Sequence, residues 1–271
     1  RIHEGSKLKV AVLITGQLRD YKINWRNHIK HLIEPNNADV FAYISSKNTL
    51  HSCGKSLEQK YYLTNTYTND EITESLNEIY GDHLKKLVID NDENLPDENF
   101  GTLGYFRTRM QNQIDNIGKG FELAKKYSEN NNFEYDAFVR CRPDNSMFPK
   151  VVEIRNKIQD NLIYSTRFTP SGHRDLCFFA MANRHTFEKY CSYKYLDGEN
   201  ANRTDTNFEC TEWAWEAYLK QNDVEVKYIH DICRPFTGFY KDRPVSEFPY
   251  RNKQEKLIDA HGNFVDQVEP V

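Results

Sequence analysis

Residues 7–16 read KLKVAVLITG, a nearly continuous apolar run that ends at a threonine and a glycine. A short run of this kind, rich in β-branched residues, predicts a strand buried on both faces of a largely parallel sheet. Apolar side chains then recur at helical spacing over residues 24–33, where Pro35 is expected to end the helix, and residues 38–45 again have strand character. A strand, a helix and a second strand within the first 45 residues predict an α/β fold.

The same alternation continues along the chain. We expect further helices over residues 70–80, 103–129, 183–193 and 211–221, and further strands over residues 84–89, 135–140, 161–167, 175–182 and 225–230. No internal repeat or low-complexity linker interrupts this pattern in the sequence, so we expect a single domain over residues 1–240. Its central sheet is expected to be mostly parallel, with helices on both faces, and an irregular extension with several prolines follows over residues 241–271.

The composition excludes several classes of protein. Of the 271 residues, 36 are Lys or Arg and 40 are Asp or Glu, and this balance argues against a general nucleic-acid-binding protein, which normally has a basic excess. No apolar run approaches the roughly 20 residues that a membrane-spanning helix needs. The six cysteines are scattered and lack the spacing of a zinc site, so we expect reduced thiols in a cytoplasmic protein.

Polar residues follow the first predicted strand, where residues 15–19 read TGQLR. In an open α/β sheet, ligands bind at the carboxyl ends of the strands. A glycine there lets a ligand approach backbone N–H groups, and Arg19 can face a phosphate. An ordinary turn between a strand and a helix has the same appearance, so this segment is a weak signal on its own.

A second strand end carries a stronger signal, because residues 140–144 read RCRPD directly after the predicted strand 135–140. Arg140 and Arg142 are expected on one side of the chain, since side chains of a strand repeat every second residue. Guanidinium groups match the oxygens of a diphosphate, and the carboxylate of Asp144 can hold Mg²⁺ or Mn²⁺. The alternative is an Arg–Asp ion pair in a solvated turn.

Three segments resemble a known family of glycosyltransferases, encoded in bacterial capsule clusters and in large DNA viruses. They are residues 15–19, residues 35–41 (PNNADVF), and the block FEYDAFVRCRPD at residues 133–144, which follows Gln113 and the helical residues 119–127. The resemblance covers about two-thirds of the chain. It implies a GT-A-type fold, a UDP- or GDP-sugar donor, a glycan acceptor and a divalent metal ion. In GT-A enzymes a D-x-D motif ends the equivalent strand, whereas here Arg142 replaces the first aspartate and Asp144 matches the second.

The resemblance and the residue chemistry together assign roles to individual residues. The donor is expected to bind in the half formed by residues 1–149, at Thr15, Gly16, Gln17, Arg19, Gln113, Arg140, Arg142 and Asp144. The metal ion is expected at Asp144 and at His230, which ends the last predicted strand.

Residues 150–240 form the acceptor half in this interpretation and are expected to supply the catalytic base. Inverting GT-A enzymes carry that carboxylate at a helix start, which makes Glu212 the first candidate and Glu209 the second, with Asp175 at the acceptor side. A structural role is the alternative for Glu212, Asp175 and His230. Glu212 follows Thr211, a good N-cap residue, and a glutamate in the first turn of a helix stabilises the helix dipole. Asp175 is otherwise an ordinary loop charge, and a single histidine such as His230 is often structural.

The sequence therefore predicts a glycosyltransferase that makes a cell-surface or virion glycan. A non-catalytic nucleotide- or carbohydrate-binding module is the alternative, because the first aspartate of D-x-D is missing. A sugar nucleotidyltransferase is less favoured, since such enzymes open with a glycine-rich loop and residues 15–17 hold one glycine.

Overall fold

The computed structural model of the chain describes residues 8–18, 21–46, 67–91, 103–147, 152, 154–168, 173–174, 176–194, 210–229, 233–235, 250–251, 257–258 and 264–265. For some residues in the helices and strands the structure describes the backbone and not the side chain. These are residues 22–24, 103–110, 146–147, 167–168, 173–174, 210–213 and those from 233 onward.

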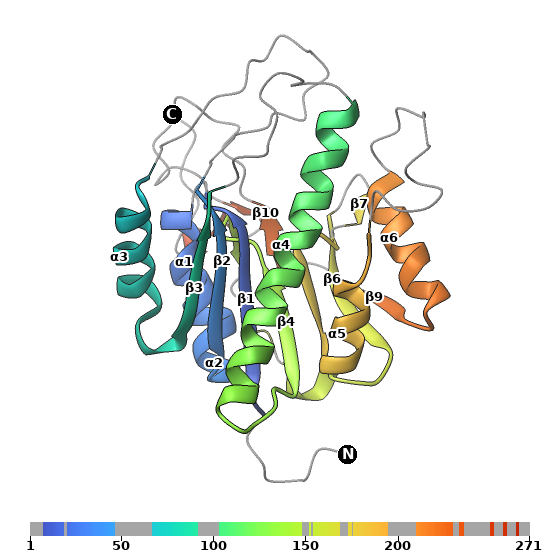
Figure 1. The fold of residues 1–271 in the computed structure, drawn as a ribbon, viewed down its shortest axis with the longest axis horizontal. Helices are drawn as coiled ribbons and strands as arrows, with labels where there is room; N and C mark the ends of the chain where they lie inside the picture. The colour runs from blue at the N-terminus through green and yellow to red at the C-terminus, as the bar shows by residue number, and fades with distance from the viewer. Residues whose placement is uncertain are drawn as a thin grey trace.

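An eight-stranded mixed sheet forms the centre of the molecule (Figure 1), in the order β3-β2-β1-β4-β8-β6-β7, with β9 paired to β6. Its strands are β1 (Val10–Gln17), β2 (Asp39–Ser45), β3 (Leu84–Asp90), β4 (Ala137–Cys141), β6 (Leu162–Phe168), β7 (His173–Arg174), β8 (Phe179–Asn183) and β9 (Glu225–Ile229). Strands β3, β2, β1 and β4 run parallel to one another, β8 is antiparallel to both β4 and β6, and β9 is parallel to β6. The predicted α/β class is confirmed.

Helices cover both faces of the sheet (Figure 1). They are α1 (Tyr21–His28), the π-helical turn η1 (Ile29–Ile33), α2 (Glu34–Asn36), α3 (Asn69–Tyr80), α4 (Leu103–Asn130), α5 (Arg184–Cys191) and α6 (Cys210–Gln221), with 3₁₀ turns η2 (Gly81–His83) and η4 (Arg155–Lys157). Among the described helices, none combines the length and the apolar character needed to cross a membrane.

Outside the main sheet, β5 (Asn145–Met147) pairs with β10 (Cys233–Pro235). Three two-residue strands, β11 (Tyr250–Arg251), β12 (Leu257–Ile258) and β13 (Phe264–Val265), form a separate antiparallel sheet. Residues 241–271, which we expect to form an irregular extension, contain these three short strands.

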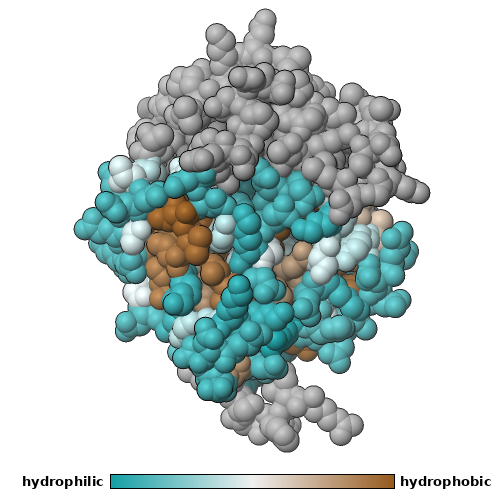
Figure 2. All heavy atoms as spheres, in the orientation of Figure 1, coloured by the Kyte–Doolittle hydropathy of each residue, from teal (hydrophilic) through white to brown (hydrophobic). Residues whose placement is uncertain are grey.

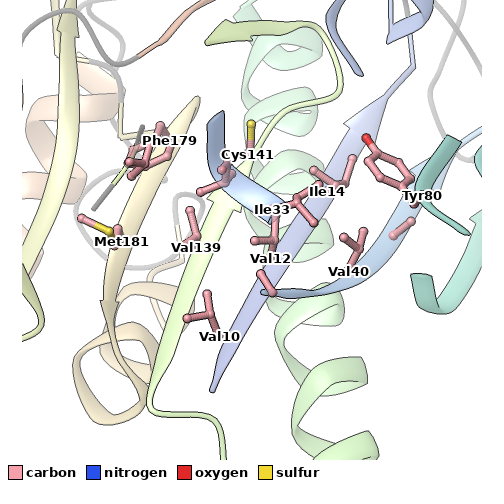
Figure 3. Close-up of a cluster of buried hydrophobic side chains, with 14 of the residues drawn as sticks. Val10, Val12, Ile14, Ile33, Val40, Tyr80, Val139, Cys141, Phe179 and Met181 are labelled. Atoms are coloured by element: carbon pink, nitrogen blue, oxygen red, sulfur yellow. The ribbon is translucent and has the colours of Figure 1, made fainter. Parts of the chain in front are cut away.

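Alternating side chains of β1 divide the core into two layers. Val10, Val12 and Ile14 pack in the cluster under α1 and α3, where Figure 3 shows them with neighbours from β2 and β4. Ala11 and Leu13 face the second cluster, which α4, α5 and α6 cover. A strand buried on both faces is what the continuous apolar run predicts.

Helix α4 lies directly against β1 on this second face. A Cβ atom added to Gly120 would come within 2.7 Å of Cγ2 of Thr15, so only a glycine allows this close approach. Figure 2 shows this side of the molecule as largely hydrophilic, with a hydrophobic patch on the side of α4 where β2 and β3 run.

Two expected boundaries are wrong. Pro35 does not end the helical segment: Ile33 and Glu34 keep right-handed helical backbone angles, and α2 continues through Pro35 to Asn36. The chain leaves the helix at Asn37, whose φ of 45° is left-handed. Helix α6 begins at Cys210, so Thr211 lies inside the helix and is not its N-cap.

Candidate functional site

The order of the central strands reverses between β1 and β4. From β1 the chain goes to β2 and then β3 on one side, and later returns to β4 on the other side. β1 and β4 are parallel neighbours, with Leu13 opposite Arg140 and Ile14 opposite Cys141. Their carboxyl ends therefore lie side by side at a topological switch point, where open α/β sheets bind ligands. The two strand ends singled out in the sequence are brought together here.

The end of β1 is longer than predicted, because the strand continues through Gly16 to Gln17. Gly16 has a φ of 115°, which side chains rarely adopt, although an added Cβ atom would meet nothing within 4 Å. The glycine is therefore required by the backbone conformation and not by lack of space. Thr15 is fully buried. Arg19 lies outside the described residues.

Arg140 reaches from β4 towards this edge of the sheet. Its Nη1 donates to the carbonyl of Phe178 (2.5 Å) and its Nη2 to the carbonyl of Thr15 (3.3 Å). Thr15 lies two residues beyond Leu13, the residue opposite Arg140, and Phe178 comes just before the residue opposite Cys141. Both acceptors are therefore nearer the carboxyl edge than Arg140 itself.

The guanidinium of Arg140 is a buried charge, with 0% of the residue exposed. Burial lowers its pKa, but an arginine keeps its proton in a protein. Among the described residues no carboxylate pairs with it, and its Nε has no hydrogen-bond partner there. A cation that is held only by neutral carbonyls favours a nearby anion, because desolvation of the charge is not offset.

Arg142 and Asp144 form a two-pronged ion pair. Nε of Arg142 donates to Oδ1 of Asp144 (2.7 Å), and its Nη2 pairs with Oδ2. The guanidinium also lies over the ring of Phe178, 4.3 Å from its centroid. Side-chain exposure is 12% for Arg142 and 0% for Asp144, so the pair that the sequence suggested as an alternative is present, but it is not a solvated one.

The metal ion implied by the family resemblance does not fit this arrangement. A divalent cation binds to carboxylate oxygens, and both oxygens of Asp144 accept hydrogen bonds from Arg142. No group of three His, Cys, Asp or Glu side chains that could hold a metal ion occurs among the described residues. His230 lies outside them, so its role as a ligand stays a prediction.

Side chains from four elements bind residues 176–178, which form a turn and not the start of the strand expected from residue 175. Gln113 of α4 donates to the carbonyl of Cys177 (2.9 Å), and Tyr190 of α5 donates to that of Leu176 (2.6 Å). The carbonyl of Phe178 accepts from Asn145 of β5 (2.6 Å) as well as from Arg140 of β4. Gln113, expected at the donor, is thus used to hold this turn.

A buried histidine that the sequence analysis did not single out supports the turn that carries Asp144. Nε2 of His28 lies 2.6 Å from the carbonyl oxygen of Asn145 and 3.7 Å from Sγ of Cys141. Burial lowers the pKa of His28 to about 4 and raises that of Cys141 to about 12, so both are neutral near pH 7. Neutral His28 then donates its Nε2 proton to Asn145. The contact joins residues 117 positions apart, so no local pattern in the sequence predicts it.

A second polar group missed in the sequence lies at the ends of β2 and β3, beside α4. Oδ2 of Asp90 accepts from the hydroxyl of Tyr43 (2.6 Å) and from Nζ of Lys119 (3.0 Å). These hydrogen bonds, led by that of Tyr43, lower the pKa of Asp90. The group adds an ionised carboxylate and an ammonium to the edge of the sheet that holds the switch point.

The candidate base residues are not placed in the same detail. The backbone of Glu212 lies in the first turn of α6, and its side chain is outside the described part of the chain. Asp175 and Glu209 also lie outside it. Nearby Trp215 is buried and stacks on Tyr190, with ring centroids 4.5 Å apart, so it belongs to the core.

The chain was compared with models of known protein families and with curated proteins, and neither comparison gives a match.

Proposed function

We propose that this protein is a glycosyltransferase of GT-A type that moves a sugar from a UDP- or GDP-sugar to a glycan acceptor at a cell surface or on a virion. The observation that carries the proposal is the position of the two donor motifs. The ends of β1 and β4 are parallel neighbours at the switch point of the sheet. A nucleotide placed there lies at the site that such sheets use for ligands.

The charges at this edge suit the leaving group of such a reaction. An acceptor hydroxyl oxygen bonds to the anomeric carbon, and the bond from that carbon to the phosphate oxygen breaks. The electron pair leaves with the nucleoside diphosphate, and the hydroxyl proton goes to a carboxylate base. Fixed positive groups near the departing oxygens stabilise the transition state. Arg140 and Arg142 are such groups, and they come from one strand end.

The base stays a prediction that rests on the resemblance. Glu212 is the first candidate because a carboxylate at a helix start is where inverting GT-A enzymes carry it, and α6 does begin next to it. We place the reaction in the cytoplasm, in line with the reduced thiols of Cys141 and Cys191 among the described residues.

Incubation with a panel of UDP- and GDP-sugars, with and without Mn²⁺, tests the proposal. We expect one donor to raise the thermal unfolding temperature and to be slowly hydrolysed to its nucleoside diphosphate. Glu212→Gln should keep the thermal shift and lose the hydrolysis, and Glu216→Gln one turn along α6 is the matched control. A shift without hydrolysis in the unmodified protein favours the binding module instead. No response to any nucleotide sugar contradicts the proposal.

A further inference from the structure

We infer that the guanidinium of Arg142, held in place by Asp144, takes the position and the role of a divalent cation at the diphosphate, so that nucleotide binding needs no metal ion. This inference rests on the proposed function. Its starting observation is that both oxygens of Asp144 accept hydrogen bonds from Arg142, at the site where the resemblance places the metal.

The arrangement resists exchange of Arg142 for a metal ion. Arg142 is fixed twice, by its two-pronged pairing with Asp144 and by its contact with the ring of Phe178. A cation that entered would have to break both contacts and displace a guanidinium of the same charge sign. The charge of the fully buried Asp144 is already neutralised, so little electrostatic gain remains for an ion.

The exposure of the two partners decides which one meets a ligand. Asp144 has no exposed side-chain surface, whereas 12% of the side chain of Arg142 is exposed. An incoming anion therefore meets the guanidinium and not the carboxylate. Arg140 is fully buried and donates to carbonyls nearer the same edge, so the two arginines and one carboxylate described at this strand end leave one net positive charge. Guanidinium groups bind phosphate oxygens in a two-pronged manner, which suits a diphosphate.

The inferred role requires no proton transfer at the leaving group. The bond between the anomeric carbon and the phosphate oxygen breaks, its electron pair stays on that oxygen, and the diphosphate departs as an anion. Arg142 keeps all its protons and balances the added charge, as a bound cation otherwise does.

Calorimetric titration of the protein with UDP and with GDP, in EDTA and again in Mn²⁺, tests the inference. We expect the dissociation constant of the nucleotide that binds to differ by less than about threefold between the two conditions. Binding seen only with Mn²⁺ overturns the inference and leaves the proposed function standing. Binding of neither nucleotide in either condition overturns both.

Two variants link the result to these residues. Arg142→Gln alone leaves a buried carboxylate without its partner and is expected to be unstable, so the double variant Arg142→Gln/Asp144→Asn is used, in which two amides can still bond to each other. We expect its nucleotide affinity in EDTA to fall at least tenfold, while Arg155→Gln, at an exposed position, keeps it. Unchanged affinity in the double variant overturns the inference.

Mn²⁺ binding gives a readout that does not depend on the nucleotide. Paramagnetic resonance of free Mn²⁺ should show the same uptake by the unmodified protein and by Asp144→Asn. Loss of a bound Mn²⁺ in Asp144→Asn would show that this carboxylate is a metal ligand and overturn the inference.

Discussion

Arg142 and Asp144 are buried to different degrees, and this difference predicts unequal contributions to stability. Asp144 is fully buried, so Arg142→Ala strands a charge that cannot reach water, and we expect a loss of about 3–5 kcal/mol in the free energy of unfolding. Asp144→Ala leaves a partly exposed guanidinium, which water can solvate, and should cost less. Urea denaturation of both variants measures the two losses. Equal losses below about 1 kcal/mol would contradict a buried pair.

Because burial lowers the pKa of His28, we expect the protein to lose stability in acid. The unfolded chain binds a proton on this histidine near pH 6.5, whereas the folded protein does so only near pH 4. Between these values the unfolded state binds more protons, so lowering the pH favours unfolding, by about 3 kcal/mol in total. Urea denaturation at pH 7, 6, 5 and 4 should show this fall. It should shrink in His28→Gln and persist in His185→Gln, at an exposed position. An unchanged pH profile in His28→Gln would contradict the prediction.

Gly120 allows helix α4 to lie close to strand β1, and Gly118 in the same helix serves as the control. Gly120→Ala places a Cβ atom 2.7 Å from Cγ2 of Thr15, a branched and fully buried side chain, so α4 must move away from β1. Overpacking of this kind costs about 1–3 kcal/mol, more than the gain of up to about 1 kcal/mol from helix propensity. At Gly118 the nearest atom to an added Cβ is 3.8 Å away. Gly118→Ala should therefore stabilise the protein and Gly120→Ala destabilise it. Thermal unfolding of both variants is the measurement, and stabilisation by Gly120→Ala contradicts the packing.

Elements with a strong local pattern could be predicted from the sequence. The apolar run of β1 and the periodic helix α4 were expected within a few residues of where they lie, because burial on two faces or on one stripe leaves its period in the sequence. The sequence predicts a strand over residues 175–182, whereas residues 176–178 form a turn. Its carbonyls are bound by Gln113, Arg140, Asn145 and Tyr190, which are distant in the chain and leave no local signal.

In the candidate site, too, some features follow from local sequence patterns and others depend on contacts between distant residues. The meeting of the strand ends at residues 15–17 and 140–144 follows from the rules of parallel sheets and was predictable. The pairing of Arg142 with Asp144 was one of two alternatives, since spacing alone does not tell a metal ligand from an ion-pair partner. The support of this turn by His28 depends on packing of α1 against β5 and leaves no local pattern in the sequence.

The molecule as a whole is slightly acidic, but the carboxyl edge of its central sheet carries buried positive charge. The net charge is −4, yet Arg140 is a buried cation without a described carboxylate partner, and it is directed to the switch point. A local positive charge in a negative molecule selects small anions rather than the long phosphate backbone of a nucleic acid. This is the physical basis for proposing a nucleoside diphosphate as the ligand.

A crystal structure of the protein with UDP, or with GDP if that is the nucleotide that binds, shows directly where the diphosphate lies. We expect the diphosphate beside the carboxyl ends of β1 and β4, with phosphate oxygens about 3 Å from the guanidinium of Arg142. A diphosphate bound at another edge of the sheet, with Arg142 still paired to Asp144 and away from it, would contradict the account.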